Sequence, residues 1–290
     1  MTRMLQSMKH RGPDSTGYAL YGPQGTGVLV RYKLADSNSP RDFDYLDRLD
    51  RHQAEVQSRM ESLGAKVLSS HAETEYAYRV TLEYGGDLKR LVDYVEDVPE
   101  AEVLSIGHSL EIVKDLGDAE TVAGGYHLNE FNGTHAIGHV RMATESDVDI
   151  SGAHPYWAYP FSDVAVVHNG QLTNYHQWRR RLERAGHRFQ SDCDSEIIAV
   201  YLAERMAQGD SLEEAMRRSL SDLDGVFTYL CVTEDALGMA KDELGAKPLV
   251  LYEADDIVAL ASEEIAIRKV VDHEIETYDP YESEVMVWSR

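Results

Sequence analysis

The chain has 290 residues, a length that fits one large domain or two small ones. Its formal net charge of −23 argues against nucleic acid and against an anionic membrane surface as partners, because both require basic patches. No stretch approaches the roughly 18 apolar residues that span a bilayer, the first residues contain no apolar secretory segment, and two cysteines do not make a disulfide framework. We therefore expect a cytoplasmic protein.

The excess of acid over base admits two hypotheses. The chain has 51 Asp and Glu against 28 Lys and Arg, and lysine is scarce. Such a composition is typical of salt-adapted proteins, because molar salt shortens the Debye length to about 3 Å and relieves repulsion between like charges. The alternative is an ordinary acidic cytoplasmic protein, and composition does not decide between them.

The N-terminal part predicts a hairpin followed by an insert. Residues 16–33 predict a β-hairpin, because two apolar runs flank a Gly-Pro-Gln-Gly turn. Residues 34–118 predict a small αβ insert between two strands of the main domain, with docking to a partner or regulation as its expected role and surface decoration as the alternative. Its expected elements are helices over 42–63 and 87–95 and strands over 77–84 and 101–107.

The remainder predicts two packed β-sheets covered by helices, an α+β architecture. The expected strands cover 135–141, 164–168, 226–233, 238–241, 249–252, 257–261 and 285–288. The expected helices cover 175–185 and 194–208, and Ser211 opens a third with a capping box. Ser262 is expected to cap a short last helix.

Three segments of this second half carry the chemistry of a glutamine pocket. Arg141 can hold a carboxylate through two parallel charge-assisted hydrogen bonds. Asn169 and the backbone N–H of Gly170 can stabilise an oxyanion, and Asp194 can accept from an α-ammonium group. The segments are Gly-His-Val-Arg-Met-Ala-Thr over 138–144, Val-His-Asn-Gly-Gln-Leu-Thr over 167–173 and Ser-Asp-Cys-Asp-Ser-Glu over 191–196.

This set, in this order, resembles the class II glutamine amidotransferase domain, a member of the N-terminal-nucleophile hydrolases. The resemblance begins in the His-Arg-Gly-Pro-Asp-Ser-Thr-Gly block at 10–17, continues through Ala-His-Pro at 153–155 and ends near 247–249 and 261–263. It implies one amidotransferase domain over 1–290 with the four-layer αββα sandwich of that class, and no cofactor on this chain.

The resemblance also assigns further residues to the pocket. Thr144 would hydrogen-bond the substrate, and His154 would line the same pocket, although a histidine fixed in a loop before proline is the alternative. Asp194 could cap its own helix as well as bind the substrate amine. Arg11 would support the N-terminal strand and the nucleophile, or play a plain structural role.

The front of the chain departs from the family pattern. The family places a cysteine directly after the initiator methionine; its thiolate attacks the amide carbon, and its own α-amine acts as the base. Here the second residue is Thr2. We expect that the recorded start is an internal methionine, with the cysteine upstream; a shortened, non-hydrolytic relative is the alternative. Thr2 itself is a weaker candidate, because Thr2 belongs to a predicted helix.

The internal cysteines and histidines do not supply an alternative site. Cys193 and Cys231 lack a free α-amine, and we expect two buried or half-buried thiols. His135 and His139 lie on a predicted strand, where a separation of four residues places them about 13 Å apart. No Cys/His pair has the spacing of a zinc site, so we expect no metal.

The sequence therefore predicts a subunit that hydrolyses glutamine and delivers ammonia to a partner synthase. The nearest resemblance is to stand-alone amidotransferase subunits of glutamate-synthase-like systems, such as N-methylglutamate synthase. This implies a flavin-dependent partner subunit and an oligomeric assembly. The alternative is a non-catalytic glutamine-binding or assembly subunit of the same complex.

Overall fold

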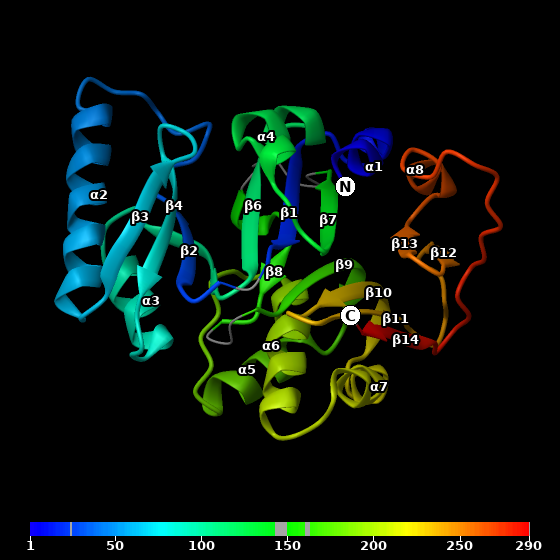
Figure 1. Cartoon of the computed structure of the whole chain (residues 1–290). Helices are drawn as coiled ribbons and strands as arrows, with labels where there is room; N and C mark the ends of the chain where they lie inside the picture. Colours follow the sequence, from blue (N-terminus) through cyan, green and yellow to red (C-terminus); the bar gives the residue numbers. More distant parts are fainter. Residues whose placement is uncertain (24, 143–149, 160–162, 290) are drawn as a thin grey trace.

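The computed structural model describes residues 1–23, 25–142, 150–159 and 163–289. Two β-sheets form the centre of the molecule (Figure 1). Helices α1 and α4 pack on the outer face of one sheet, and α5, α6 and α7 cover the outer face of the other. The α+β architecture of four layers that the sequence predicts is confirmed.

The first central sheet has three antiparallel strands in the order β6-β1-β7. They are β6 (Leu110–Leu116), β1 (Ser15–Tyr21) and β7 (His135–Arg141). Every residue of β1 is buried, because α1 (Thr2–Ser7) and α4 (Ala119–Gly125) cover one face and the second sheet lies against the other. Short 3-10 helices occupy Lys9–Arg11, Leu128–Glu130 and Ile150–Gly152.

The second central sheet has five antiparallel strands in the order β14-β11-β10-β9-β8. They are β8 (Tyr156–Trp157), β9 (Ala165–Leu172), β10 (Gly225–Val232), β11 (Ala236–Lys241) and β14 (Val285–Ser289). Its helices are α5 (Tyr175–Arg184), α6 (Asp194–Ala207) and α7 (Leu212–Asp222). Helix α6 is apolar around most of its circumference, because it packs against the sheet and against both neighbouring helices. The predicted capping box at Ser211 is present.

A small C-terminal lobe stands beside β7. Strands β12 (Val250–Ala254) and β13 (Ile257–Ala261) form a separate two-stranded sheet, followed by α8 (Glu264–Ile267) (Figure 1). The expectation that Ser262 caps this last helix is wrong. Glu263 occupies the N-cap position, and its side chain makes no capping hydrogen bond.

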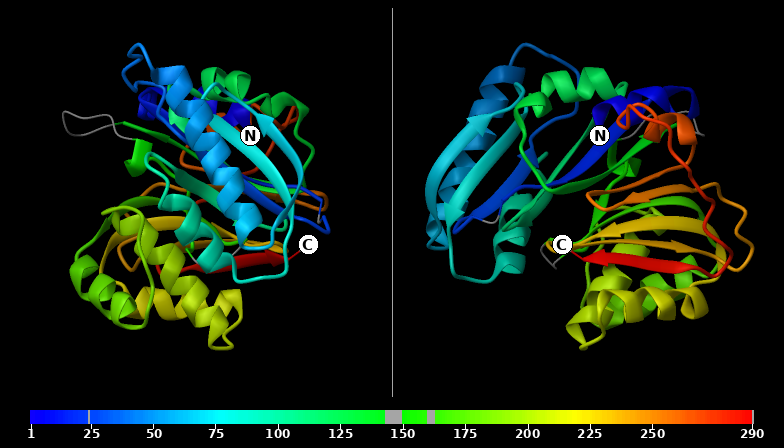
Figure 2. Two further views of the ribbon diagram at one scale, coloured as in Figure 1. Left: turned by 90° about the vertical axis from the view of Figure 1, so that its left-hand side faces the viewer. Right: turned by 45° about the vertical axis from the view of Figure 1, so that its right-hand side comes forward.

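A third layered region, which we call the αβ unit, lies to one side of the central sheets (Figure 2). It is a four-stranded sheet in the order β3-β4-β2-β5, with two helices packed on it. Its elements are β2 (Val28–Lys33), α2 (Tyr45–Ser62), β3 (Lys66–Ala72), β4 (Ala77–Glu83), α3 (Leu88–Glu96) and β5 (Glu102–Gly107).

The predicted hairpin over 16–33 is wrong, because β1 and β2 belong to different sheets. Strand β1 is buried on both faces and pairs along its whole length with β6 and β7, so both of its edges are occupied. Strand β2 instead lies between β4 and β5 in the αβ unit. The sheet of the insert expected over 34–118 thus begins at β2, and β6 belongs to the central sheet.

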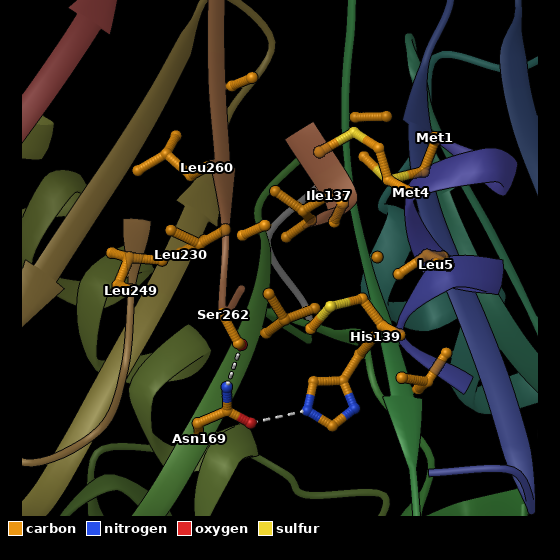
Figure 3. A pocket seen from close by; sticks show the side chains of 18 of the residues that line it. Met1, Met4, Leu5, Ile137, His139, Asn169, Leu230, Leu249, Leu260 and Ser262 are labelled. Carbon is orange, nitrogen blue, oxygen red and sulfur yellow. Dashed lines mark hydrogen bonds between the residues drawn. The ribbon is translucent and has the colours of Figure 1, made fainter. Parts of the chain in front are cut away.

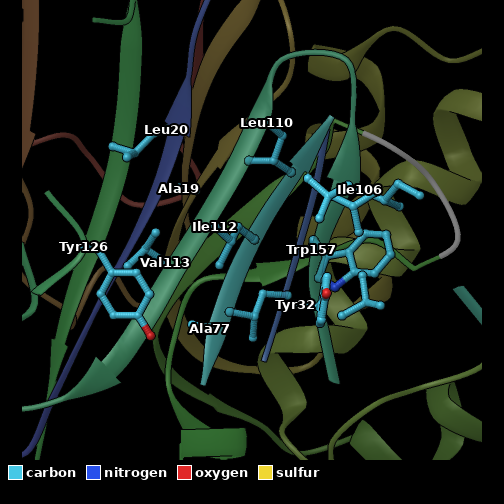
Figure 4. Close-up of a cluster of buried hydrophobic side chains, with 14 of the residues drawn as sticks. Ala19, Leu20, Tyr32, Ala77, Ile106, Leu110, Ile112, Val113, Tyr126 and Trp157 are labelled. Carbon is cyan, nitrogen blue, oxygen red and sulfur yellow. The ribbon is translucent and has the colours of Figure 1, made fainter. Parts of the chain in front are cut away.

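The αβ unit shares one hydrophobic core with the central sheets (Figure 4). Buried side chains from β1, β2, β5, β6 and β8 form a single contiguous cluster, which includes Ala19, Tyr32, Ile106, Ile112 and Trp157. The unit is therefore packed into the domain.

Among the helices in the described ranges, none has both the length and the apolar character needed to cross a membrane.

Candidate functional site

Asn169 lies on β9 at the centre of the candidate site. Its side-chain Oδ1 accepts a hydrogen bond from His139 Nε2 at 3.1 Å, and its Nδ2 donates to Ser262 Oγ at 3.2 Å (Figure 3). These partners come from β7 and from the segment after β13. The amide is therefore held between the central sheet and the C-terminal lobe, with the nitrogen and oxygen ends fixed in direction.

Gly170 has a backbone conformation and a packing environment that exclude a side chain. Its φ is +135°, and a Cβ added there would lie 2.0 Å from the carbonyl oxygen of Val226 on β10. Only glycine fits such a position without displacing the neighbouring strand. The Asn-Gly pair is therefore built into the strand geometry, and is more than a turn dipeptide.

Asp194 is the first residue of α6 and is tied to β9. Its Oδ2 accepts the backbone N–H of Leu172 at 2.7 Å, and its Oδ1 lies 3.8 Å from His168 Nδ1. The suggestion that Asp194 caps its own helix is wrong, since Cys193 is the N-cap residue. An acidic side chain in the first helical turn still interacts favourably with the helix dipole. Its side chain is 22% exposed and can reach a ligand.

Three histidines and one serine form a buried polar cluster beside Asn169. Ser195 Oγ lies 2.8 Å from His154 Nε2 and 2.9 Å from His168 Nδ1. The rings of His139 and His154 lie 4.3 Å apart between centroids. Burial lowers the pKa of His139 and of His168 to about 4 and lowers the pKa of His154 well below its usual value. All three are therefore neutral at pH 7.

The predicted pocket residue His154 joins this cluster through a close approach to β1. A Cβ added at Gly17 would lie 1.9 Å from the carbonyl oxygen of His154, and the His154–Pro155 peptide bond is cis. Gly17 therefore leaves the space that the loop before Pro155 fills. The blocks at 10–17 and 153–155, far apart in sequence, are packed against each other.

Arg141 ends β7 and lies within electrostatic reach of the same cluster. Its positive charge contributes, after burial, to the lowered pKa values of His139 and His154. Its guanidinium group lies over Gly152, where an added Cβ would be 2.9 Å from each terminal nitrogen. Thr144, predicted to bind substrate beside it, lies outside the described residues.

Arg11 connects the N-terminal segment to the C-terminal lobe. Its guanidinium donates to Glu263 Oε1 at 2.9 Å, and His10 Nε2 lies 3.1 Å from the same carboxylate. These contacts lower the pKa of the Glu263 carboxyl, with the Arg11 hydrogen bond as the largest favourable cause. Because Glu263 follows Ser262, Arg11 fixes the segment that contacts Asn169.

An apolar cavity of about 290 Å³ opens between β7 and β13 (Figure 3). His139, Asn169 and Ser262 lie at one end of it. In the part of the chain that the structure describes, β7 pairs with β1 alone and β13 with β12 alone, so each strand has a free edge. The apolar lining comes mainly from Met1, Met4, Leu5, Ile137, Leu230, Leu249 and Leu260.

Both cysteines are free thiols, and they differ in setting. Cys231 lies on β10 in the core, where burial raises its pKa to about 12. Cys193 is partly exposed, and its thiol lies 3.5 Å from Ser195 Oγ and 3.7 Å from Asp194 Oδ1. Within the described ranges, no group of three or more His, Cys, Asp or Glu side chains is arranged to hold a metal ion.

The sequence did not point to His139, His168 or Ser195 as site residues. Each stands in a segment that was singled out, directly beside a predicted site residue or two positions from one. Two features of the sequence could have indicated them: their position inside the motifs, and the presence of polar residues in otherwise buried strands. Hydrophobic periodicity does not show which residues they contact.

Comparison with known proteins identifies the class. A model described as the glutamine amidotransferase domain matches residues 139–269. A relative named "Putative glutamine amidotransferase", from Methanothermobacter thermautotrophicus, is 41% identical over 98% of this chain and 92% of its own length. The glutamine amidotransferase-like protein GlxB of Rhizobium meliloti is 35% identical over 100% of this chain and 92% of its own length.

Two solved structures share the fold. The glutamine phosphoribosylpyrophosphate amidotransferase of B. subtilis aligns with a TM-score of 0.61 at 20% identity, over 99% of this chain and 44% of its own. A structure of the allosteric regulatory enzyme of purine biosynthesis aligns with a TM-score of 0.60 at 20% identity, over 99% of this chain and 43% of its own. This chain spans less than half of either enzyme. The fold is that of the N-terminal-nucleophile hydrolases, and the chain belongs to the class II glutamine amidotransferase family.

Proposed function

We propose that this chain binds glutamine at the candidate site and serves as the glutaminase part of an ammonia-transferring enzyme. Arg141 and Thr144 bind the substrate carboxylate, and Asp194 accepts from its α-ammonium group. Asn169 and Gly170 face the side-chain amide. The observation that carries the proposal is the fixed Asn169 amide, held by His139 and Ser262 at the end of a cavity.

The chemistry expected at Asn169 is stabilisation of a tetrahedral oxyanion. Attack of a thiolate on the glutamine amide carbon moves an electron pair onto the carbonyl oxygen. The leaving amide nitrogen takes the proton that the thiol gave to the α-amine and departs as ammonia, which leaves a thioester. Water then cleaves the thioester and releases glutamate and the thiol. A side-chain amide nitrogen carries two N–H donors. With one donated to Ser262, the second can stabilise the oxyanion together with the Gly170 N–H.

The attacking thiol requires a place close to Asn169. The apolar cavity between β7 and β13 suits an extended apolar segment that carries such a thiol, since both strands offer free edges for pairing in the described ranges. Arg11, which ties the N-terminal segment to Glu263, would support that segment. Cys231 does not suit the role, because its thiol is buried in β10 with a raised pKa.

We further propose that the ammonia passes to a flavin-dependent, glutamate-synthase-like partner in an oligomeric assembly in the cytoplasm. This proposal rests on the resemblance to stand-alone amidotransferase subunits. Ammonia must stay sheltered on its way, because in water near neutral pH it becomes unreactive ammonium.

Calorimetric titration with L-glutamine tests substrate binding. The unsubstituted chain should bind L-glutamine and discriminate against D-glutamine. Arg141→Met and Asp194→Asn should each weaken binding roughly tenfold or more, the weight of one charge-assisted hydrogen bond. Arg217→Met is the matched control, since Arg217 forms an exposed ion pair with Glu213 on α7. Absence of L-glutamine binding by the unsubstituted chain would overturn the proposal.

A non-catalytic glutamine-binding subunit is the second candidate. It is favoured by the setting of the two cysteines, one buried and one beside Asp194, neither with a free α-amine. A variant extended at its N-terminus by an apolar segment that starts with cysteine separates the two functions. Labelling of that cysteine by a diazo-ketone glutamine analogue, with release of ammonia from glutamine, supports the enzyme. Glutamine binding without labelling or ammonia release supports the binding subunit.

A further inference from the structure

The αβ unit contacts the loop that leads into the candidate site. Gln190, in the loop over 187–193, makes three side-chain hydrogen bonds there. Its Nε2 donates to Glu96 Oε1 on α3 at 2.7 Å and to the carbonyl oxygen of Val103 on β5 at 3.1 Å. Its Oε1 accepts from Trp157 Nε1 at 2.9 Å. One side chain therefore joins the αβ unit, β8 and the loop.

The same loop is fixed on its other side by a buried carboxylate. Glu196, in the first turn of α6, accepts the backbone N–H of Gln190 and of Ser191, each at 2.8 Å, and the hydroxyl of Ser191 at 2.7 Å. Glu196 is 1% exposed, and burial raises its pKa. The loop is thus clamped between α3 and the first turn of α6, and a shift of its backbone would displace that turn.

The first turn of α6 carries Asp194. Its Oδ2 accepts the Leu172 N–H at 2.7 Å, three residues along β9 from Asn169. A continuous series of contacts therefore runs from Glu96 on α3, through Gln190 and Glu196, to Asp194 at the candidate site. Each step in this series is either a hydrogen bond or a covalent connection along α6 shorter than one helical turn.

A second contact between the loop and α3 is weaker. Arg188 pairs with Asp93 at 2.6 Å and with Glu96, and its guanidinium lies over the ring of Tyr159 at 5.1 Å from the centroid. The Arg188 side chain is 41% exposed. Solvent and salt screen an ion pair at that exposure. Arg188 and Gln190 share the Glu96 carboxylate, and Gln190 also bonds the carbonyl oxygen of Val103 on β5 and the indole of Trp157 on β8, so Gln190 makes the more extensive link.

We propose that Gln190 is a positioning residue for glutamine binding, through which the αβ unit holds Asp194 in place. The inference rests on the proposed function, since it assigns the αβ unit a role in binding the substrate's α-ammonium group. The αβ unit would then position a substrate-binding residue as well as contribute side chains to the hydrophobic core.

The test compares Gln190→Leu with a control on α3, the helix of the αβ unit that Gln190 contacts. Leucine keeps the approximate volume and removes all three hydrogen bonds. The control is Lys89→Met, which breaks the Lys89–Asp93 pair at 2.9 Å on α3 without touching Gln190. Two measurements are made on each full-length chain: hydrogen exchange at the backbone amides of Ser191 and Leu172, and the Kd for L-glutamine by calorimetry.

Gln190→Leu should accelerate exchange at both amides and raise the Kd for glutamine by roughly tenfold, the equivalent of one lost hydrogen bond. Lys89→Met should match the unsubstituted chain in both measurements. Unchanged exchange at Leu172 in Gln190→Leu would overturn the inference even if the unsubstituted chain binds glutamine. Accelerated exchange with an unchanged glutamine Kd would overturn it as well. Failure of the unsubstituted chain to bind glutamine would instead overturn the proposed function, and exchange at Leu172 would still decide whether Gln190 holds Asp194.

Discussion

Three neutral histidines beside Asn169 determine how the site responds to acid. His139 and His168 have pKa values of about 4, and His154 has one well below the usual value, mainly because burial disfavours the charged ring. One ring nitrogen of each histidine, Nδ1 of His139 and of His154 and Nε2 of His168, is buried and makes no hydrogen bond to the residues that the structure describes. Protonation of His139 or His154 would place a positive charge within electrostatic reach of Arg141 in a buried cluster.

The pH dependence of stability follows from these shifts. Between about pH 6.5, the usual histidine pKa, and pH 4, the unfolded chain binds protons that the folded chain does not. The free energy of unfolding should therefore be highest above pH 6.5 and fall toward pH 4, by about 1.4 kcal/mol per pH unit for each buried histidine. Urea unfolding of the unsubstituted chain and of His168→Gln at pH 5, 6 and 7.5 measures this.

Between pH 5 and 6, the free energy of unfolding of His168→Gln should depend less steeply on pH than that of the unsubstituted chain, and the difference should correspond to about one proton. His127→Gln is the control, because the His127 side chain is exposed and lies outside the buried cluster. Equal slopes for the unsubstituted chain and His168→Gln would contradict the prediction, whatever the absolute stability of the variant.

The sequence could indicate the motif residues of the candidate site but not the side-chain contacts that hold them. Arg141, Asn169, Gly170 and Asp194 belong to motifs whose chemistry can be recognised without coordinates. Their supporting contacts join residues far apart in the chain. His139 lies 30 positions from Asn169, and Ser262 lies 93 positions from it. No periodicity encodes such a pairing, so the cluster became visible only when the sheets were placed.

At the scale of elements, buried charges explain why one central strand escaped the sequence patterns. Strand β6 was not predicted, because Leu110–Leu116 does not alternate polar and apolar residues. Its Glu111 and Lys114 are both buried. Glu111 accepts from Arg31 at 2.8 Å and from Arg79 at 2.6 and 2.9 Å, so charges that suggest an exposed segment are paired inside the fold. Helices α2, α3, α5 and α6 carried clear apolar faces or termination signals and were predicted within a few residues.

The Glu111 cluster should be essential for docking of the αβ unit. Glu111 lies on β6 of the central sheet, whereas Arg31 and Arg79 lie on β2 and β4 of the αβ unit. Glu111→Gln leaves two arginines without their shared carboxylate, and Arg31 is only 5% exposed. Removal of one partner from a buried pair leaves a poorly compensated charge, here with Glu73 remaining at 3.8 Å from Arg31, so we expect a loss of about 3 kcal/mol in the free energy of unfolding. Urea denaturation measures it.

Limited proteolysis locates the effect of Glu111→Gln. Cleavage within the αβ unit should become faster than in the unsubstituted chain, since its sheet is no longer held to β6. Glu83→Gln is the control, because the Lys66–Glu83 pair of the same unit is exposed to solvent on both sides. A loss of stability in Glu83→Gln as large as in Glu111→Gln, or none in either variant, would show that burial of the pair is unimportant.

At the scale of the whole molecule, the surplus of 23 negative charges opposes compaction. Salt screens this repulsion, and it also weakens attractive surface pairs such as Arg41–Glu75. With 51 acidic against 28 basic side chains, many carboxylates have no basic side chain to pair with, so relief of repulsion should outweigh the loss of surface pairs. Buried clusters such as that of Glu111 are screened much less and should persist.

We therefore expect the melting temperature to rise steeply between about 0.1 M and 1 M KCl, as the Debye length shortens from about 10 Å to about 3 Å. KCl is preferable to sulfate salts, which stabilise proteins by exclusion from their surface. A variant with Asp255→Asn and Asp256→Asn, both exposed in the β12–β13 turn, should show a smaller rise, because two of the repelling charges are gone. A flat melting temperature would contradict salt adaptation and favour an ordinary acidic protein. An equally steep rise in the doubly substituted variant would place the repulsion elsewhere on the surface.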